Sequence, residues 1–131
     1  MKKTELLNSM LSSVVSEMGH TDMLCIGDAG LPVPKGVQRI DLAVSKGIPS
    51  FLEVLDAVLT ELKVEKITIA SEMKDHNAVM YREITKRFPG LVIHEVPHVQ
   101  FKEKTQDCRA VVRTGECTGF SNVILQSGVT F

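Results

Sequence analysis

Tryptophan is absent from this sequence of 131 residues, tyrosine occurs once, and aromatic residues make up only 5% of the chain. Such a chain offers few side chains on which nucleic acid bases could stack. It also lacks an excess of basic charge, because 15 lysines and arginines face 16 aspartates and glutamates. Nucleic acids and anionic membranes select concentrated basic faces. The composition therefore argues against both as partners.

Cysteine is scarce as well, and Cys25, Cys108 and Cys117 show no CxxC spacing. An odd, scattered set suits a reducing cytoplasm better than a disulfide framework. No apolar run approaches the roughly 20 residues that a membrane span needs. The opening residues 1–5 do not resemble a signal peptide, so we expect a cytoplasmic protein.

Short apolar or β-branched segments alternate with longer segments whose apolar residues recur at helical spacing. The expected strands are 23–27, 37–42, 66–70, 91–96, 110–113 and a last strand that begins at 122. The expected helices are 8–18, 50–62, 78–88 and 98–106. This alternation predicts one α/β domain over residues 1–131, with three layers in which helices flank a largely parallel sheet.

Three segments carry more detailed expectations. Ser50 and Glu53 match a capping box, which marks the beginning of the second helix. Leu7 and Met10 fall on the apolar face of the first helix and are expected to be buried. Residues 71–77 are mostly polar and are expected to form a loop.

Polar side chains follow three of the expected strands. Asp28 follows the first strand, His98 follows the fourth, and the loop 116–122 follows the fifth. Because ligands of open α/β sheets collect at the carboxyl ends of the strands, these three loops could converge on one site. Carboxylate, imidazole and amide groups together suit a small polar molecule such as a sugar.

His20 and Asp28, which are separated by a turn and a five-residue strand, are expected to lie near one pocket, and each has a structural as well as a chemical interpretation. His20 lies where the first helix should end, so its imidazole could either stabilise that end as a cation or exchange protons near neutral pH. Asp28 precedes Ala29 and Gly30, so it could either form a turn or accept hydrogen bonds from hydroxyl groups. The sequence leaves both pairs of interpretations open.

No cofactor motif is present. Residues 27–30 contain two glycines but lack the third glycine of a dinucleotide fingerprint, and Pro32 and Pro34 block the helix that should follow. His20, Asp22 and Asp28 lie near one another without a typical metal-ligand spacing. We therefore expect neither a metal nor an organic cofactor.

Several segments resemble a known family, the D-ribose pyranases, to which the fucose mutarotases are related. The segments that carry the resemblance are 19–22, 28–34, 113–116 and 128–131, and the similarity extends over the whole chain. The resemblance implies an isomerase that interconverts the pyranose and furanose forms of D-ribose. It also implies a ring-shaped homo-oligomer with sites near subunit boundaries.

The resemblance further assigns roles to residues. His20 would be the proton donor, and the sugar would be bound by Asp28, His98 and the segment Phe120-Ser121-Asn122, with Lys102 as a further candidate. The sequence departs from the family at Phe120, where tyrosine is expected, and at Ser121, where alanine is expected. A non-catalytic sugar-binding or transport-accessory protein would use the same polar groups and remains the alternative.

Overall fold

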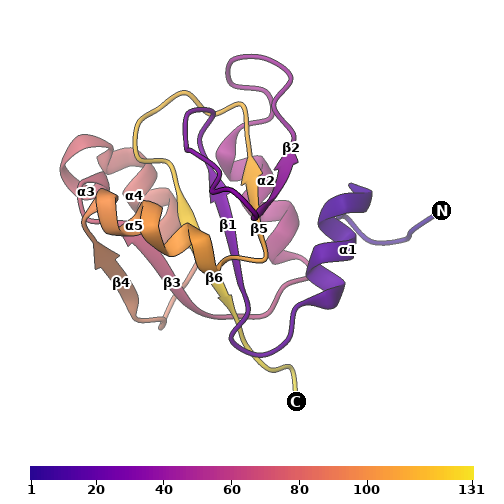
Figure 1. Cartoon of the computed structure of the whole chain (residues 1–131). Coiled ribbons are helices and arrows are strands. Elements are labelled where there is room, and N and C mark those ends of the chain that lie inside the picture. The colour runs from indigo at the N-terminus through magenta and orange to yellow at the C-terminus, as the bar shows by residue number, and fades with distance from the viewer.

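Six strands form a single sheet in the order β2-β5-β1-β6-β3-β4 (Figure 1). The structure is a computed structural model that describes residues 1–131. The strands are β1 (Met23–Gly27), β2 (Gln38–Asp41), β3 (Val64–Ala70), β4 (Ile93–Val96), β5 (Ala110–Arg113) and β6 (Val123–Ser127). Strands β1 to β5 all run in one direction, whereas β6 is antiparallel to its neighbours β1 and β3. The expectation of a largely parallel sheet is confirmed.

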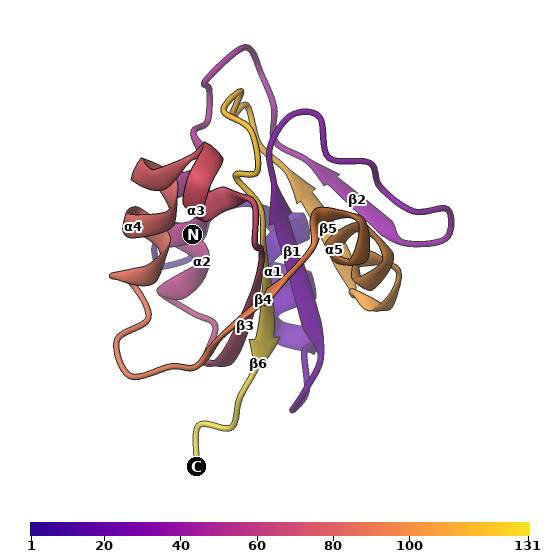
Figure 2. The same ribbon diagram turned by 90° about the vertical axis from the view of Figure 1, so that its left-hand side faces the viewer.

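Helices cover both faces of this sheet. They are α1 (Ser9–Glu17), α2 (Phe51–Leu59), α3 (Met73–His76), α4 (Ala78–Thr85) and α5 (His98–Lys104), the last followed by a 3₁₀ turn at Thr105–Asp107. Seen edge-on, the sheet has α2 and α4 on one side and α5 on the other, which gives the three layers expected from the sequence (Figure 2). None of the helices combines the length and the apolar character needed to cross a membrane.

Alternate residues of the central strands supply the two cores. Leu24 and Ile26 of β1 belong to the larger apolar cluster, which they share with α1, α2 and α4. Cys25 between them faces the opposite way, into a smaller cluster that includes Phe101 of α5. Period-two side-chain alternation thus covers β1 on both faces, and Leu24, Cys25 and Ile26 are fully buried. This arrangement explains why β1 is apolar throughout its centre.

The details of several elements differ from the sequence-based expectations. Leu7 and Met10 are 66% and 46% exposed, so they do not contribute to the buried face of α1. Residues 71–77 are not a simple loop, because Met73 is fully buried and begins the short helix α3. The capping box at Ser50 and Glu53 is present as expected.

Candidate functional site

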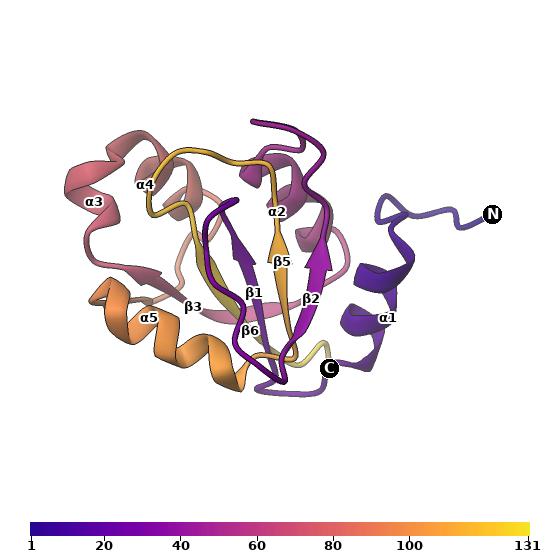
Figure 3. The same ribbon diagram turned by 45° about the horizontal axis from the view of Figure 1, so that its top comes forward.

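The candidate site lies at the edge of the sheet where the carboxyl ends of β1 to β5 meet the amino end of β6. Figure 3 turns this edge toward the viewer and shows the loop between β5 and β6 arching over it toward α3 and α4. Asp28 directly follows β1, His98 follows β4, and Asn122 directly precedes β6. The fold therefore brings together the three loops that the sequence analysis selected.

Asp28 and Asn122 form a reciprocal pair. The backbone N–H of Asp28 donates to Oδ1 of Asn122 at 2.9 Å, and the amide Nδ2 of Asn122 donates to Oδ2 of Asp28 at 3.0 Å. The other carboxylate oxygen accepts from the backbone N–H of Gly30 at 2.9 Å. Asp28 thus forms the turn and also presents a carboxylate. Each oxygen keeps a lone pair for another donor, such as a sugar hydroxyl.

The glycine before Asp28 makes this pair possible. A Cβ atom at Gly27 would lie 2.6 Å from Cδ2 of Leu31 and 2.9 Å from Oδ1 of Asn122. Both distances are too short for a real side chain, so only glycine allows the buried amide of Asn122 to approach the end of β1.

His98 and Phe120 form the aromatic part of the site. Their rings meet edge-to-face with centroids 5.1 Å apart. The ring of Phe120 also contacts the ring of His76, with centroids 5.7 Å apart. Phe120 has a φ angle of +61°, a left-handed conformation that bulky residues rarely adopt. The ring of Phe120 is half-buried, so an aromatic surface remains at this edge although the chain has no tyrosine hydroxyl there.

The backbone N–H of His98 donates to both carboxylate oxygens of Glu72, at 3.0 and 2.9 Å. These bonds anchor His98, the first residue of α5. They act in place of an N-cap side chain, because Pro97, at the N-cap position, makes no such hydrogen bond. Partial burial lowers the pKa of His98 below its usual value, and the positive charge of Lys102 adds to this effect against the opposing charges of Glu72 and Asp28. His98 is therefore held toward its neutral form, and its buried Nδ1 has no hydrogen-bond partner.

Ser121 lies in the same loop, but its hydroxyl is occupied. Its Oγ lies 2.7 Å from Oγ1 of Thr118 and accepts from Nδ2 of Asn77 at 3.1 Å. Because Ser121 is also fully buried, its side chain contributes to the shape of the loop. Lys102 is exposed on α5, one turn beyond His98.

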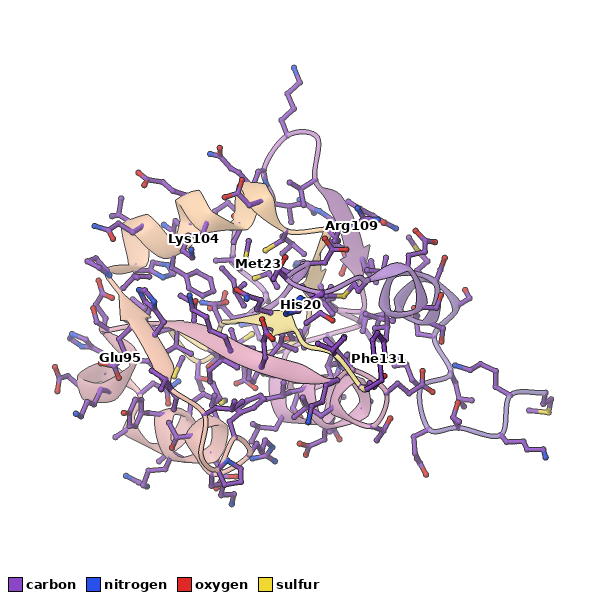
Figure 4. All side chains as sticks on the ribbon, turned by 90° about the horizontal axis from the view of Figure 1, so that it is seen from below. His20, Met23, Glu95, Lys104, Arg109 and Phe131 are labelled. Carbon is purple, nitrogen blue, oxygen red and sulfur yellow. The ribbon has the colours of Figure 1, made fainter.

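His20 lies at the opposite edge of the sheet. Figure 4 views the molecule from that side and shows His20 near the middle of this face, with Phe131 at the nearby carboxyl terminus. Its Nε2 is 2.9 Å from Oε2 of Glu65, and its side chain is 53% exposed. The five-residue strand β1 separates His20 from Asp28 and spans roughly 17 Å. One chain therefore does not bring His20 together with the other predicted site residues.

Three further residues contribute to the site, and the sequence gives no sign of this because residues 71–77 are mostly polar and predict a loop: Glu72, His76 and Asn77. Asn77 caps α4 by accepting from the backbone N–H of Met80 at 3.3 Å. An asparagine directly before a helical pattern is a recognisable capping signal, so this residue could have been found. The contact of Glu72 with His98 crosses 26 residues of chain and left no local signal.

The four-residue spacing of His94 and His98 resembles a metal-binding pair on a helix. Here His94 lies within β4 and His98 begins α5, so the spacing does not place both on one helical face. No group of three or more histidine, cysteine, aspartate or glutamate side chains is arranged to hold a metal ion.

The chain is an α/β protein whose six-stranded sheet gathers a carboxylate, an amide, an imidazole and an aromatic ring at its carboxyl edge, and these groups form its candidate site for a small polar ligand. The chain belongs to the RbsD / FucU transport protein family, whose model matches residues 1–130. The family resemblance noted from the sequence is thereby confirmed.

Individual relatives match the chain over its full length. A D-ribose pyranase of Rhodopirellula baltica is 55% identical and one of Lactiplantibacillus plantarum is 53% identical, with all of each chain covered. The structure of Bacillus subtilis RbsD complexed with D-ribose superposes with a TM-score of 0.97 at 43% identity, again over all of both chains. FucU from Bifidobacterium longum gives a TM-score of 0.79 at 25% identity and covers 97% of this chain and 99% of its own.

Proposed function

We propose that this chain is a cofactor-independent isomerase that interconverts the pyranose and furanose forms of D-ribose. The observation that carries the proposal is the convergence of Asp28, Asn122, His98 and Phe120 at one edge of the sheet. Full-length relatives named D-ribose pyranase and a close structural neighbour complexed with D-ribose support the choice of sugar. Residues 1–131 then form a single sugar-mutarotase domain.

The reaction is the opening and reclosure of a hemiacetal. The ring oxygen gains a proton while the anomeric hydroxyl loses one, and the C–O bond between the ring oxygen and the anomeric carbon breaks. The resulting aldehyde is then attacked by a different hydroxyl, which loses its proton as the new ring oxygen forms, while the aldehyde oxygen gains a proton and becomes the anomeric hydroxyl again. No electrons are transferred overall, so acid and base groups suffice for the balance.

The site residues divide these tasks. Asp28 holds sugar hydroxyls through its remaining lone pairs, the buried amide of Asn122 holds that carboxylate in place, and the Phe120 ring packs against the apolar face of the sugar. His20 donates the proton to the ring oxygen. Either His98, which is held toward its neutral form, or a water molecule removes the proton from the anomeric hydroxyl.

Because His20 lies at the opposite edge from Asp28, it must come from a second copy of the chain. We place the complete site where the carboxyl edge of one chain meets the His20 edge of a neighbour. A contact between two different edges is heterologous, and such contacts close into a ring when the rotation between copies permits it. The proposal thus includes a homo-oligomeric ring, acting on ribose in the cytoplasm.

The test measures exchange between ribose forms by saturation-transfer NMR. The wild-type protein should accelerate exchange, and His20→Ala should reduce that acceleration by about 10²–10⁴-fold, the usual contribution of a positioned general acid. His94→Ala is the matched control, because His94 lies in β4 outside the site. A wild-type protein that binds ribose without accelerating exchange would instead be a sugar-binding or transport-accessory protein, and the isomerase proposal would fail.

A further inference from the structure

Asn77, at the junction of α3 and α4, uses its side-chain amide in two directions. Its Oδ1 accepts from the backbone N–H of Met80 and caps α4. Its Nδ2 donates to the carbonyl of Gly119 at 2.9 Å and to Oγ of Ser121 at 3.1 Å. One side chain therefore joins the beginning of a helix to a loop more than forty residues away in the sequence.

The two acceptors flank Phe120, the residue with the left-handed backbone. A bulky residue at a φ of +61° is strained and persists only where its surroundings determine the conformation. Asn77 holds the residue on each side, and the Thr118 hydroxyl supports Ser121 at 2.7 Å. No other side chain donates a hydrogen bond to the carbonyl of Gly119.

The conformation of this loop determines two features of the site. The left-handed turn at Phe120 directs its ring against His98, with centroids 5.1 Å apart. It also leads directly into Asn122, whose amide pairs with Asp28. A change of φ at Phe120 would move both the aromatic surface and the buried amide.

We propose that Asn77 is a positioning residue for the sugar site. Its Nδ2 group fixes the loop 118–122 and thereby places Phe120 against the bound sugar and Asn122 against the carboxylate of Asp28. The inference rests on the proposed function, since it assigns Asn77 a part in binding the same substrate. Asn77 itself acts only through the loop.

The substitution Asn77→Asp separates this role from helix capping. Aspartate keeps the oxygen that accepts from Met80 and caps a helix as well as asparagine does, but it loses the Nδ2 donor. Asn8→Asp is the matched control, because Asn8 caps α1 in the same way through the N–H of Leu11 and lies far from the site in the fold.

In the saturation-transfer assay we expect Asn77→Asp to raise KM for D-ribose about tenfold and to change kcat by less than about threefold. Groups that hold the sugar equally in the ground and transition states affect KM in this way, and His20 is untouched. The control Asn8→Asp should match wild type in both constants. Asn8→Asp should unfold near the wild-type temperature, whereas Asn77→Asp should stay folded but unfold at a lower temperature, because it keeps its helix cap and loses two hydrogen bonds.

Three results would overturn the proposal: unchanged KM in Asn77→Asp, a fall in kcat without a rise in KM, or an equal rise in KM for Asn8→Asp. If Asn77→Asp fails to fold, Asn77→Ser replaces it, because serine retains a capping hydroxyl but is too short to reach Gly119.

Ribose affinity measured by titration calorimetry separates this inference from the proposed function. If the wild type binds ribose but does not catalyse exchange, the isomerase proposal fails, while a tenfold weaker Kd in Asn77→Asp would still support the positioning role. If the wild type catalyses exchange and Asn77→Asp behaves identically, only the positioning role fails.

Discussion

At the scale of single residues, Asp28 combines two tasks that the sequence presented as alternatives. One oxygen accepts from Gly30 and shapes the turn, while the other accepts from the amide of Asn122. Both partners are donors, so the group at position 28 must be an acceptor on both sides. Only an ionised carboxylate meets that requirement among the side chains of this size.

Asp28→Asn should therefore damage both stability and function. The new amide NH₂ must face either the Gly30 N–H or the Asn122 amide, and the unmade hydrogen bond should lower the free energy of unfolding by about 1–3 kcal/mol. Displacement of Asn122 should reduce ribose exchange by about 100-fold. Urea unfolding and saturation-transfer NMR measure the two effects. Wild-type behaviour in both would show that the carboxylate is dispensable.

Phe120 allows the backbone and the ring to be tested separately. Phe120→Ala removes the ring but keeps the unfavourable φ, whereas Phe120→Gly removes the ring and tolerates that φ. We expect the glycine variant to be more stable than the alanine variant by about 1 kcal/mol in thermal unfolding. Both should bind ribose more weakly than wild type because both lack the aromatic surface. An alanine variant as stable as the glycine variant would contradict the left-handed assignment.

At the scale of elements, the sequence predicted most strands and helices because their residues carry local signals. The apolar run of β1 and the capping box of α2 are examples. The direction of β6 left no such signal, because a buried strand is apolar whether it runs parallel or antiparallel. Helix α3 was missed for a related reason: it has only four residues, and tertiary burial of Met73 holds it in place.

Helix α5 depends on a carboxylate from a different element. The backbone N–H of His98 holds the pKa of Glu72 below its usual value. Because the pKa of Glu72 is lower in the folded state than in the unfolded state, its ionised carboxylate stabilises the fold at any pH above the unfolded-state pKa, which is about 4.3. This contribution is lost as the pH falls through the folded-state pKa. Protonation of Glu72 should therefore loosen the start of α5 at acidic pH.

Glu72→Gln tests this dependence. Glutamine still offers an oxygen to His98 but carries no charge, so stability at pH 7 should fall by about 0.5 kcal/mol, a small value because the carboxylate is largely solvated. The difference from wild type should shrink as the pH drops below about 4, where the wild-type carboxyl also becomes neutral. Urea unfolding at several pH values from about 3 to about 7 measures this difference in the free energy of unfolding on both sides of the Glu72 titration. A constant difference across that interval would exclude the charge as the cause.

At the scale of the whole molecule, the residues of the proposed site lie at two opposite edges of the sheet. The convergence of Asp28, His98 and Asn122 could be predicted, because the carboxyl ends of parallel strands share an edge. The sequence analysis also expected His20 near the pocket of Asp28, but a single chain does not bring it there, because the five residues of β1 lie between the two side chains. In the fold its nearest polar partner is Glu65, on the edge away from the site.

A shared site makes a quantitative prediction for mixed assemblies. His20→Ala and Asp28→Asn should each be nearly inactive alone, but equal amounts co-expressed should recover about one quarter of wild-type exchange, because half the chains supply an intact His20 and half supply an intact Asp28. A site contained within one chain would recover almost nothing.

Co-expression of wild type with the double variant, which carries both His20→Ala and Asp28→Asn, gives a second comparison. A shared site predicts about one quarter of full activity, and a single-chain site predicts about one half. Light scattering on the same samples establishes that the chains assemble, so an absence of recovery in a mixed oligomer would exclude His20 of a neighbouring chain as the proton donor.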